Sequence, residues 1–309
     1  MRKRVENKPI FVVGSPRSGT SILTWCLGQH PNIVPLPESS WMGQFAIDVA
    51  IKYNIGSARE NRSVLSAMDI GRDEFFASFG NAINDLILRH REDLEKKRKI
   101  MRGKTDPKAR WVDGTPEYSF YICGLRKLFP NAKFIHIVRD VSSVVRSMLN
   151  FDRLGAGKLV ANEQEAYTYW LRTVNSCSLA ERAYGPNVVF RLRYSDLVNT
   201  PEHALQACFN FVGETFVSQC LNMLQTRINS SEVPADFKIG DSNTDPALVE
   251  QATQLSRQIE EGTAPADESP SAANEIESAF NERVQYIATV DNQYQKALEV
   301  IRTLQTTKP

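Results

Sequence analysis

The sequence lacks the long apolar runs that mark membrane proteins and secretory leaders. No apolar run approaches the roughly 20 residues that a transmembrane helix needs. The opening stretch, MRKRVENKPI, is basic, but the apolar run after it covers only residues 10–13 and leads into a glycine loop, which is typical of a strand and not of a signal peptide. A formal net charge of +1 over 309 residues gives no general reason to expect a nucleic acid or a membrane as partner.

Paired cysteines are also missing. The cysteines are odd in number, and none forms a CxxC pair. They are Cys26, Cys123, Cys177, Cys208 and Cys220. This usage favours reduced, mostly buried thiols in a cytosolic protein over a disulfide framework. A secreted form whose leader has been removed stays open as the alternative.

What the sequence does contain is an alternation of short apolar runs and amphipathic segments. The expected strands lie at residues 9–13, 133–140 and 187–194, with a strand end and a turn at 111–120. The expected helices lie at 18–29, 120–129, 141–150, 163–184 and 201–213. Alternation of this kind predicts an α/β fold with a parallel, doubly wound sheet. Right-handed crossovers then place the functional loops at the carboxyl ends of the strands.

Two further segments extend this core. Residues 41–110 are predicted to form a helical insertion over the sheet, in which 89–104 carries eight Lys or Arg against three Asp or Glu. Such a run is expected to be a solvated helix face, with a docking patch for an acidic acceptor or carrier as the alternative. After a loop at 262–273, apolar residues at spacings of three, four or seven predict a long amphipathic helix at 274–305. No internal repeat or boundary divides the chain, so residues 1–309 are interpreted as a single domain.

A glycine loop follows the first predicted strand. It reads Gly14-Ser-Pro-Arg-Ser-Gly19-Thr-Ser and has the spacing of the P-loop G-x-x-x-x-G-K-[ST], but Thr20 stands at the lysine position. The backbone N–H groups of such a loop and the dipole of the following helix favour a phosphate group. Hydrolysis of a triphosphate also needs the lysine and a magnesium ion. The loop therefore predicts a phosphate site in which Arg17 supplies the positive charge.

A second candidate phosphate site lies in VRDVSSVVRS, residues 138–147. Arg139 ends a predicted strand, and Ser147 lies eight residues later, two turns along the following helix. An arginine and a serine so placed could hold a phosphate through charge-assisted hydrogen bonds. The alternative for Arg139 is a surface ion pair with Asp140.

Together these two stretches resemble the sulfotransferases that use 3′-phosphoadenosine 5′-phosphosulfate (PAPS) as donor. That family holds the 5′ phosphosulfate in a P-[KR]-S-G-T-[TS] loop and the 3′ phosphate by an arginine and a serine eight residues apart, as in residues 16–21 and 139–147. The segment FRLRYSDLVNTPEHAL, residues 190–205, resembles the family's nucleotide-contacting Y-x-D/E-L segment. The resemblance implies a P-loop-like sulfotransferase architecture, no metal, and donor binding by Arg17, Ser18, Gly19, Thr20, Ser21, Arg139, Ser147 and Tyr194.

The resemblance also implies a general base. Glu38 lies 21 residues after Arg17 (38 minus 17) and follows the turn HPNIVPLP. Tyrosylprotein sulfotransferases and many bacterial relatives carry a glutamate at this spacing, where it takes the proton of the acceptor hydroxyl. The resemblance therefore makes Glu38 and Arg17 the expected catalytic residues, with a solvated surface glutamate as the alternative.

The sequence departs from the family on the acceptor side and around the adenine. Ile22 replaces the stacking aromatic of the cytosolic small-molecule branch, and the late R-K-G motif has no clear copy. Gly114 stands at the lysine of the substrate-side turn K-[TDS]-P, which leaves Arg17 as the main electrophilic group. Asp113 and Thr115 could line the acceptor pocket or could form a capping turn. The histidines are His30, His90, His136 and His203. His136 is expected in the core, and none of the four is expected to be the base.

The expected function is transfer of a sulfuryl group from PAPS to an acceptor hydroxyl, with adenosine 3′,5′-bisphosphate (PAP) as product. The acceptor class stays open among sugar, lipid, tyrosine and carrier-tethered hydroxyls, as does the oligomeric state. A bacterial, cytoplasmic protein is expected because no leader is found. One rival is a P-loop kinase or NTPase with Asp140 as its acid, which Thr20 argues against. The other is a non-catalytic nucleotide-binding protein that docks through 89–104.

Overall fold

Five short strands form one parallel sheet at the centre of the molecule. The computed structural model describes residues 7–59, 62–97, 110–153, 157–225, 233–234 and 237–306. The sheet has the spatial order β2-β3-β1-β4-β7, and all neighbouring strands are parallel. Its strands are β1 (Ile10–Val13), β2 (Ile33–Pro35), β3 (Arg110–Asp113), β4 (Lys133–Val138) and β7 (Val189–Arg193). The predicted α/β fold with a parallel sheet is confirmed.

Helices cover both faces of the sheet, because successive side chains of a strand point to opposite sides. On β1, Ile10 and Val12 join one apolar cluster, and Phe11 and Val13 join another. The first cluster is completed by α1 (Thr20–Gly28), α8 (Tyr194–Asn199), α9 (Pro201–Val212) and the 3-10 helix η3 (Ser218–Gln225). The second is completed by α2 (Met42–Ser57), α4 (Arg72–Lys97), α5 (Ile122–Leu128) and α7 (Glu163–Tyr184).

The remaining elements extend this layered core. Along the chain, helix α6 (Val141–Leu149) lies between β4 and a small antiparallel hairpin of β5 (Asp152–Arg153) and β6 (Gly157–Lys158). It shares a third apolar cluster with α7 and α10 (Pro246–Glu261). The other elements are α3 (Val64–Ala67), the 3-10 helix η2 (Pro116–Phe120) and α11 (Pro270–Thr306).

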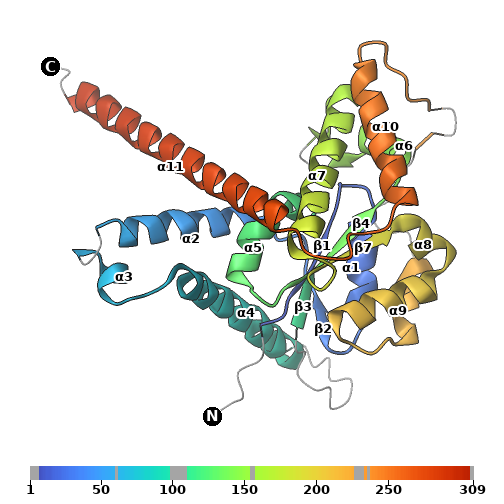
Figure 1. Cartoon of the computed structure of the whole chain (residues 1–309), viewed down its shortest axis with the longest axis horizontal. Helices are drawn as coiled ribbons and strands as arrows, with labels where there is room; N and C mark the ends of the chain where they lie inside the picture. The colour runs from blue at the N-terminus through green and yellow to red at the C-terminus, as the bar shows by residue number, and fades with distance from the viewer. Residues whose placement is uncertain are drawn as a thin grey trace.

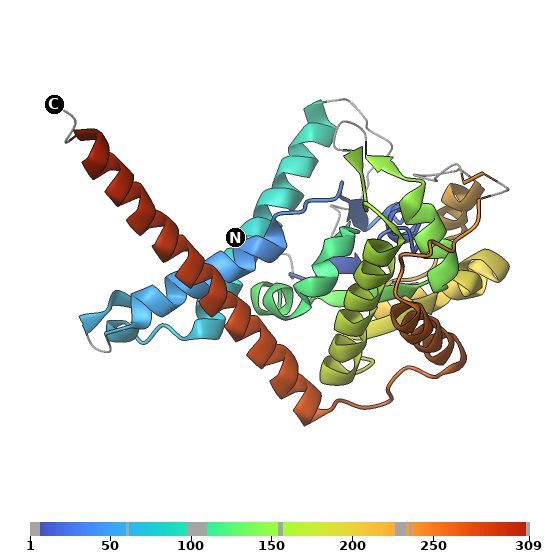
Figure 2. The ribbon, with the colours of Figure 1, turned by 90° about the horizontal axis from the view of Figure 1, so that it is seen from above.

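The C-terminal helix begins earlier than the sequence pattern predicted. Helix α11 starts at Pro270 and not at residue 274, so the loop before it is shorter than 262–273. The Ser269 hydroxyl accepts a hydrogen bond from the Ala272 N–H at 3.4 Å, and a proline suits the first helical position. The apolar stripe is buried only in the first part of α11, where Phe280 is 7% exposed, while Tyr294 is 61% exposed. Figures 1 and 2 show this distal part extending away from the sheet.

The predicted helical insertion is made of α2, α3 and α4, and two corrections concern its borders. Residue 110, placed at its end, belongs to β3, where the Arg110 Nε donates to the carbonyl of Lys8 at 2.8 Å. The stretch HPNIVPLPE, interpreted as a turn, contains strand β2, which pairs with β3 through Ile33 and Arg110. Because β2 is parallel to β3, its carboxyl end reaches the same edge of the sheet as the glycine loop.

The cysteines are all free and buried. Burial raises the pKa of Cys26 to about 12 and, beside it, that of Cys208 to about 12, so both stay thiols at neutral pH. Among the described residues, no helix combines the length and the apolar character that crossing a membrane requires.

Candidate functional site

The loop between β1 and α1 depends on two glycines. Gly14 has φ +150° and Gly19 has φ +105°, both in the region that side chains rarely adopt. A Cβ on Gly14 would lie 2.4 Å from the carbonyl oxygen of Ile137, and one on Gly19 would lie 2.7 Å from the ring of Tyr194. The loop therefore runs directly against β4 and the first residue of α8, and α1 begins at Thr20 immediately after it.

A serine from η2 holds the start of this loop. The Gly14 N–H donates to the Ser119 Oγ at 3.0 Å, and the Ser119 hydroxyl donates to the carbonyl of Pro116 at 2.7 Å. The side chains of Ser18 and Thr20 are buried, and Ser21 is half-buried. Contacts of these three hydroxyls with a donor stay predictions.

Arg17, at the tip of the loop, connects three parts of the site. Its φ of 72° is uncommon for a residue with a side chain. Its Nε donates to the Ser147 Oγ on α6 at 3.1 Å, and its guanidinium lies 3.9 Å from the centre of the Phe151 ring. Burial lowers the pKa of Arg17, the charge of Arg139 lowers it further, and the carboxylate of Glu38 raises it. The structure thus brings both predicted phosphate sites to Arg17, and the charge of Glu38 also acts on this side chain.

Arg139 directly follows β4 and supports the loop from the other side. Its Nη1 donates to the carbonyl of Arg17 at 3.2 Å, and its guanidinium lies 4.5 Å from the centre of the Tyr194 ring. The neighbouring Asp140 acts as the N-cap of α6, where its carboxylate accepts the N–H of Ser143 at 2.8 Å. The observed contacts of Asp140 are those of a helix cap, and the magnesium-binding role of the rival kinase stays untested.

Glu38 lies on the segment that leaves β2 at the carboxyl edge of the sheet. Its side chain is exposed, and its charge acts on Arg17. The chain before it is fixed by the Leu36 N–H, which donates to the carbonyl of Val112 in β3 at 2.9 Å. The chain after it is fixed by the Ser39 N–H, which donates to the Thr115 Oγ1 at 3.0 Å. An exposed carboxylate on a doubly held segment can meet an incoming hydroxyl.

Asp113 and Thr115 are fully buried beneath this segment. The Asp113 Oδ1 accepts both the N–H and the hydroxyl of Thr115, at 2.8 and 2.6 Å. Burial raises the pKa of Asp113, while hydrogen bonds from Ser39 and Thr115 act in the opposite direction. Thr115 stands at the N-cap of η2, but its hydroxyl bonds Asp113 and not the helix backbone. A role in lining the acceptor pocket stays a prediction; the observed contacts are those of an organised turn.

The glycine at the family's lysine position has a steric reason in this chain. A Cβ on Gly114 would lie 2.1 Å from the Oγ1 of Thr24 in α1. The Thr24 hydroxyl is itself fixed, because it donates to the carbonyl of Thr20 at 2.8 Å. A side chain at residue 114 would therefore require the Thr24 side chain to move out of this contact.

His136 lies in the core, as expected. His136 is buried in β4, with its Nδ1 2.6 Å from the Glu181 Oε1, and Arg191 also donates to that carboxylate. His30 is buried and its Nε2 lies 3.0 Å from the carbonyl of Thr215. His90 and His203 are exposed on α4 and α9.

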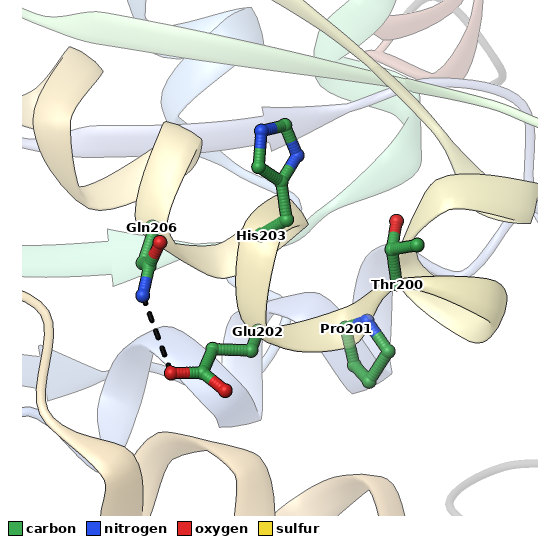
Figure 3. A pocket seen from close by; sticks show the side chains of 5 residues that line it. All are labelled: Thr200, Pro201, Glu202, His203 and Gln206. Atoms are coloured by element: carbon green, nitrogen blue, oxygen red, sulfur yellow. Dashed lines mark hydrogen bonds between the residues drawn. The ribbon is translucent and has the colours of Figure 1, made fainter.

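The lining of one surface pocket contains none of the predicted site residues. Figure 3 shows its lining at the start of α9, where the Gln206 amide donates to the Glu202 carboxylate at 3.3 Å. The other lining residues are Thr200, Pro201 and His203.

Two further predictions, the basic stretch 89–104 and a site without metal, concern parts of the chain that the structure describes only in part. Helix α4 continues to Lys97, but the side chains of residues 91–97 and all of 98–104 lie outside the description, so the basic stretch 89–104 stays a prediction. Within the described ranges, no group of His, Cys, Asp and Glu side chains is arranged to hold a metal ion.

Sequence reasoning missed four residues that organise the site. Phe151 stacks on Arg17, Ser119 holds Gly14, and Ser39 and Tyr118 fix the chain after Glu38. The sequence shows a serine pair after Glu38 and a tyrosine two residues after Pro116, but their hydrogen-bond partners lie 76 to 79 positions away along the chain. Only the fold reveals that they meet.

Comparison with known proteins gives three kinds of match. The model of the sulfotransferase family matches residues 9–218. A candidate protein-tyrosine sulfotransferase of Caenorhabditis briggsae is 24% identical over 69% of this chain and 68% of its own length. Protein-tyrosine sulfotransferase 2 of Gallus gallus is 25% identical over 66% of this chain, which spans half the length of that relative. Among solved structures, the sulfotransferase domain of the Synechococcus PCC 7002 olefin synthase is 19% identical, covers 90% of this chain and 96% of its own, and has a TM-score of 0.47.

Proposed function

Because the chain belongs to the sulfotransferase family, we propose that it transfers a sulfuryl group from PAPS to an acceptor hydroxyl, in line and without a metal. The observation that carries this proposal is the convergence on Arg17. Its Nε bonds Ser147 at 3.1 Å, its carbonyl accepts from Arg139 at 3.2 Å, and its pKa responds to Glu38. These contacts support a site in which Arg17 serves the cradle, the second phosphate site and the base together.

The residues present fit a donor with single phosphates at two separate places. The glycine loop and the first turn of α1 supply backbone N–H groups and a positive helix end for the 5′ phosphosulfate. Gly14 and Gly19 leave no Cβ in the cradle. Arg139 and Ser147 are proposed to hold the 3′ phosphate by charge-assisted hydrogen bonds, beside the ring of Tyr194.

Glu38 is proposed to be the general base. Its carboxylate would accept the proton of the acceptor hydroxyl as the oxygen forms its bond to sulfur. The bond between sulfur and the bridging oxygen of the donor breaks at the same time, and PAP leaves. Arg17 would stabilise the negative charge that develops on the transferring group and on the departing phosphate. Atoms and charge balance without any further reactant.

The acceptor is proposed to be an alcohol or phenol that reaches an open carboxylate, including a hydroxyl on a protein or on a carrier. Glu38 is exposed, and the neighbouring Trp41 is 46% exposed, so the base is reached from the surface. Two matched relatives are named for tyrosine sulfation. The acceptor of this chain has to be identified by experiment.

The experiment is transfer from sulfur-labelled PAPS to a panel of tyrosyl peptides, simple phenols, sugars and lipid or carrier-bound alcohols, with EDTA present. Appearance of label on an acceptor together with stoichiometric PAP supports the proposal. Tight binding of ATP with magnesium, weak binding of PAP, and phosphoryl transfer to the same panel would replace it with a kinase.

A further inference from the structure

A hydrogen-bonded chain of buried side chains ends on the backbone directly after Glu38. Asp113 accepts the hydroxyl of Thr115 at 2.6 Å, and the Thr115 Oγ1 accepts the N–H of Ser39 at 3.0 Å. A hydroxyl has one proton, so donation to Asp113 leaves the oxygen lone pairs of Thr115 facing Ser39. Asp113 therefore fixes the polarity of the contact that holds the chain next to Glu38.

A second contact holds the same segment a few residues later. The Tyr118 hydroxyl accepts the N–H of Met42 at 3.0 Å and is also hydrogen-bonded to the Ser39 hydroxyl. Tyr118 is 1% exposed, and its ring packs against Phe11 in the core. Between these two anchors lies Ser40, whose φ of 59° is left-handed. A strained residue persists only where its surroundings determine the conformation, and here Thr115 and Tyr118 do so.

The same short stretch also holds the phosphate cradle. Asp113 pairs with Phe11 across β3 and β1, and Ser119 accepts the N–H of Gly14 at 3.0 Å. Residues 113–119 thus contact the start of the loop that carries Arg17 and the segment that carries Glu38. A displacement of this stretch would change the distance between the two catalytic side chains.

We propose that Thr115, oriented by Asp113 and assisted by Tyr118, is a positioning residue that sets Glu38 relative to Arg17. This inference rests on the proposed function, because it assigns to the turn at 113–119 the task of aiming the base. The role assigned to these three residues is indirect. They act on the rate through the backbone of Ser39.

The test compares Thr115→Val with Thr115→Ser, because serine keeps the hydroxyl that valine lacks. Thr173→Val is the matched control: Thr173 is also fully buried, and its hydroxyl donates to the carbonyl of Tyr169 at 2.9 Å within α7, away from Glu38. Thr115→Val is expected to lower kcat by roughly tenfold to a hundredfold, with unchanged affinity for PAP. Thr115→Ser is expected to restore most of the rate, and Thr173→Val to keep it.

Two more measurements separate positioning from general structure. A nitrophenol acceptor, whose hydroxyl is more acidic, should recover part of the Thr115→Val loss. In the Thr115→Val/Glu38→Gln double variant, kcat should match that of Glu38→Gln alone, because a residue that acts only through Glu38 has nothing left to position. Hydrogen exchange at the Ser39 amide should speed up in Thr115→Val and not in Thr173→Val.

The inference is overturned if Thr115→Val loses no more activity than Thr173→Val, if it weakens PAP binding as much as kcat, or if its loss multiplies with that of Glu38→Gln. Failure of the proposed function looks different. In that case Glu38→Gln itself keeps its turnover, or the wild-type protein transfers no sulfuryl group, while the change in Ser39 exchange remains.

Discussion

Replacement of Arg139 by alanine tests the proposed second phosphate site. Loss of a charge-assisted contact with the 3′ phosphate should cost roughly 1.5–3 kcal/mol, which is on the order of tenfold to a hundredfold in affinity for PAP. The structure adds a smaller effect. Arg139 also donates to the carbonyl of Arg17 at 3.2 Å, so the cradle itself loses a hydrogen bond.

That second loss should be shared by every ligand of the cradle. A partly exposed hydrogen bond of this kind contributes about 1 kcal/mol, or about fivefold in affinity. Adenosine 5′-phosphate, which lacks the 3′ phosphate, should therefore bind Arg139→Ala about fivefold more weakly. PAP should lose that factor and the contact with its 3′ phosphate as well.

Isothermal titration without metal measures both ligands on one preparation. Arg139→Lys is the matched control, because it keeps the charge but loses the fixed planar fork and the stacking on Tyr194. It should fall between wild type and Arg139→Ala for PAP. Equal losses for PAP and adenosine 5′-phosphate would refute the assignment, since Arg139 would then only support the loop.

Two further predictions follow from the cradle and the core. Gly19→Ala should abolish detectable PAP binding and cost roughly 1–3 kcal/mol of stability, because the added Cβ would lie 2.7 Å from Tyr194. The control is Gly213→Ala, since Gly213 also has a positive φ, +77°, but has nothing within 4 Å of an added Cβ. Gly213→Ala therefore carries the backbone cost without the clash and should bind PAP normally in the same titration. Burial on its own would raise the pKa of Glu181, but His136 and Arg191 outweigh burial and lower this pKa to about 2. The stability that these two partners give is therefore complete above the ordinary pKa of 4.5 and is lost as the pH falls toward 2. Urea unfolding should therefore depend more steeply on pH in that window for wild type than for Glu181→Gln, and equal slopes would place the acid sensitivity elsewhere.

The elements with strong local signals were predictable from the sequence. Helix α7 occupies 163–184 as predicted, because Asn162 caps its start and Gly185 ends it at φ 65°. The predicted start of α11 was wrong because it was taken from the first residues of the apolar repeat. Ser269 and Pro270 are a local signal for the helix start and would have placed it correctly. Strand β2 has only three residues, too few for a periodic pattern, and it becomes a strand by pairing with β3.

The site divides in the same way. The loop around Arg17 and the pair Arg139 and Ser147 are fixed by short spacings, and the structure brings these three residues together. The support of Glu38 could not be predicted, because it arises where segments 39–42 and 113–118 cross the edge of the sheet. Such contacts depend on the order of the strands, which no spacing along the chain records.

The most direct test of the account is the turnover of Glu38→Gln at saturating donor and acceptor. The change keeps the shape of the side chain and removes the base, so kcat should fall by roughly 10²–10⁴-fold while affinity for PAP stays unchanged. Glu275→Gln, an exposed glutamate on α11, controls for the loss of one surface charge and should turn over normally. Near-normal kcat in Glu38→Gln would contradict the account, because Glu38 would then be a surface residue beside Arg17 and not the base.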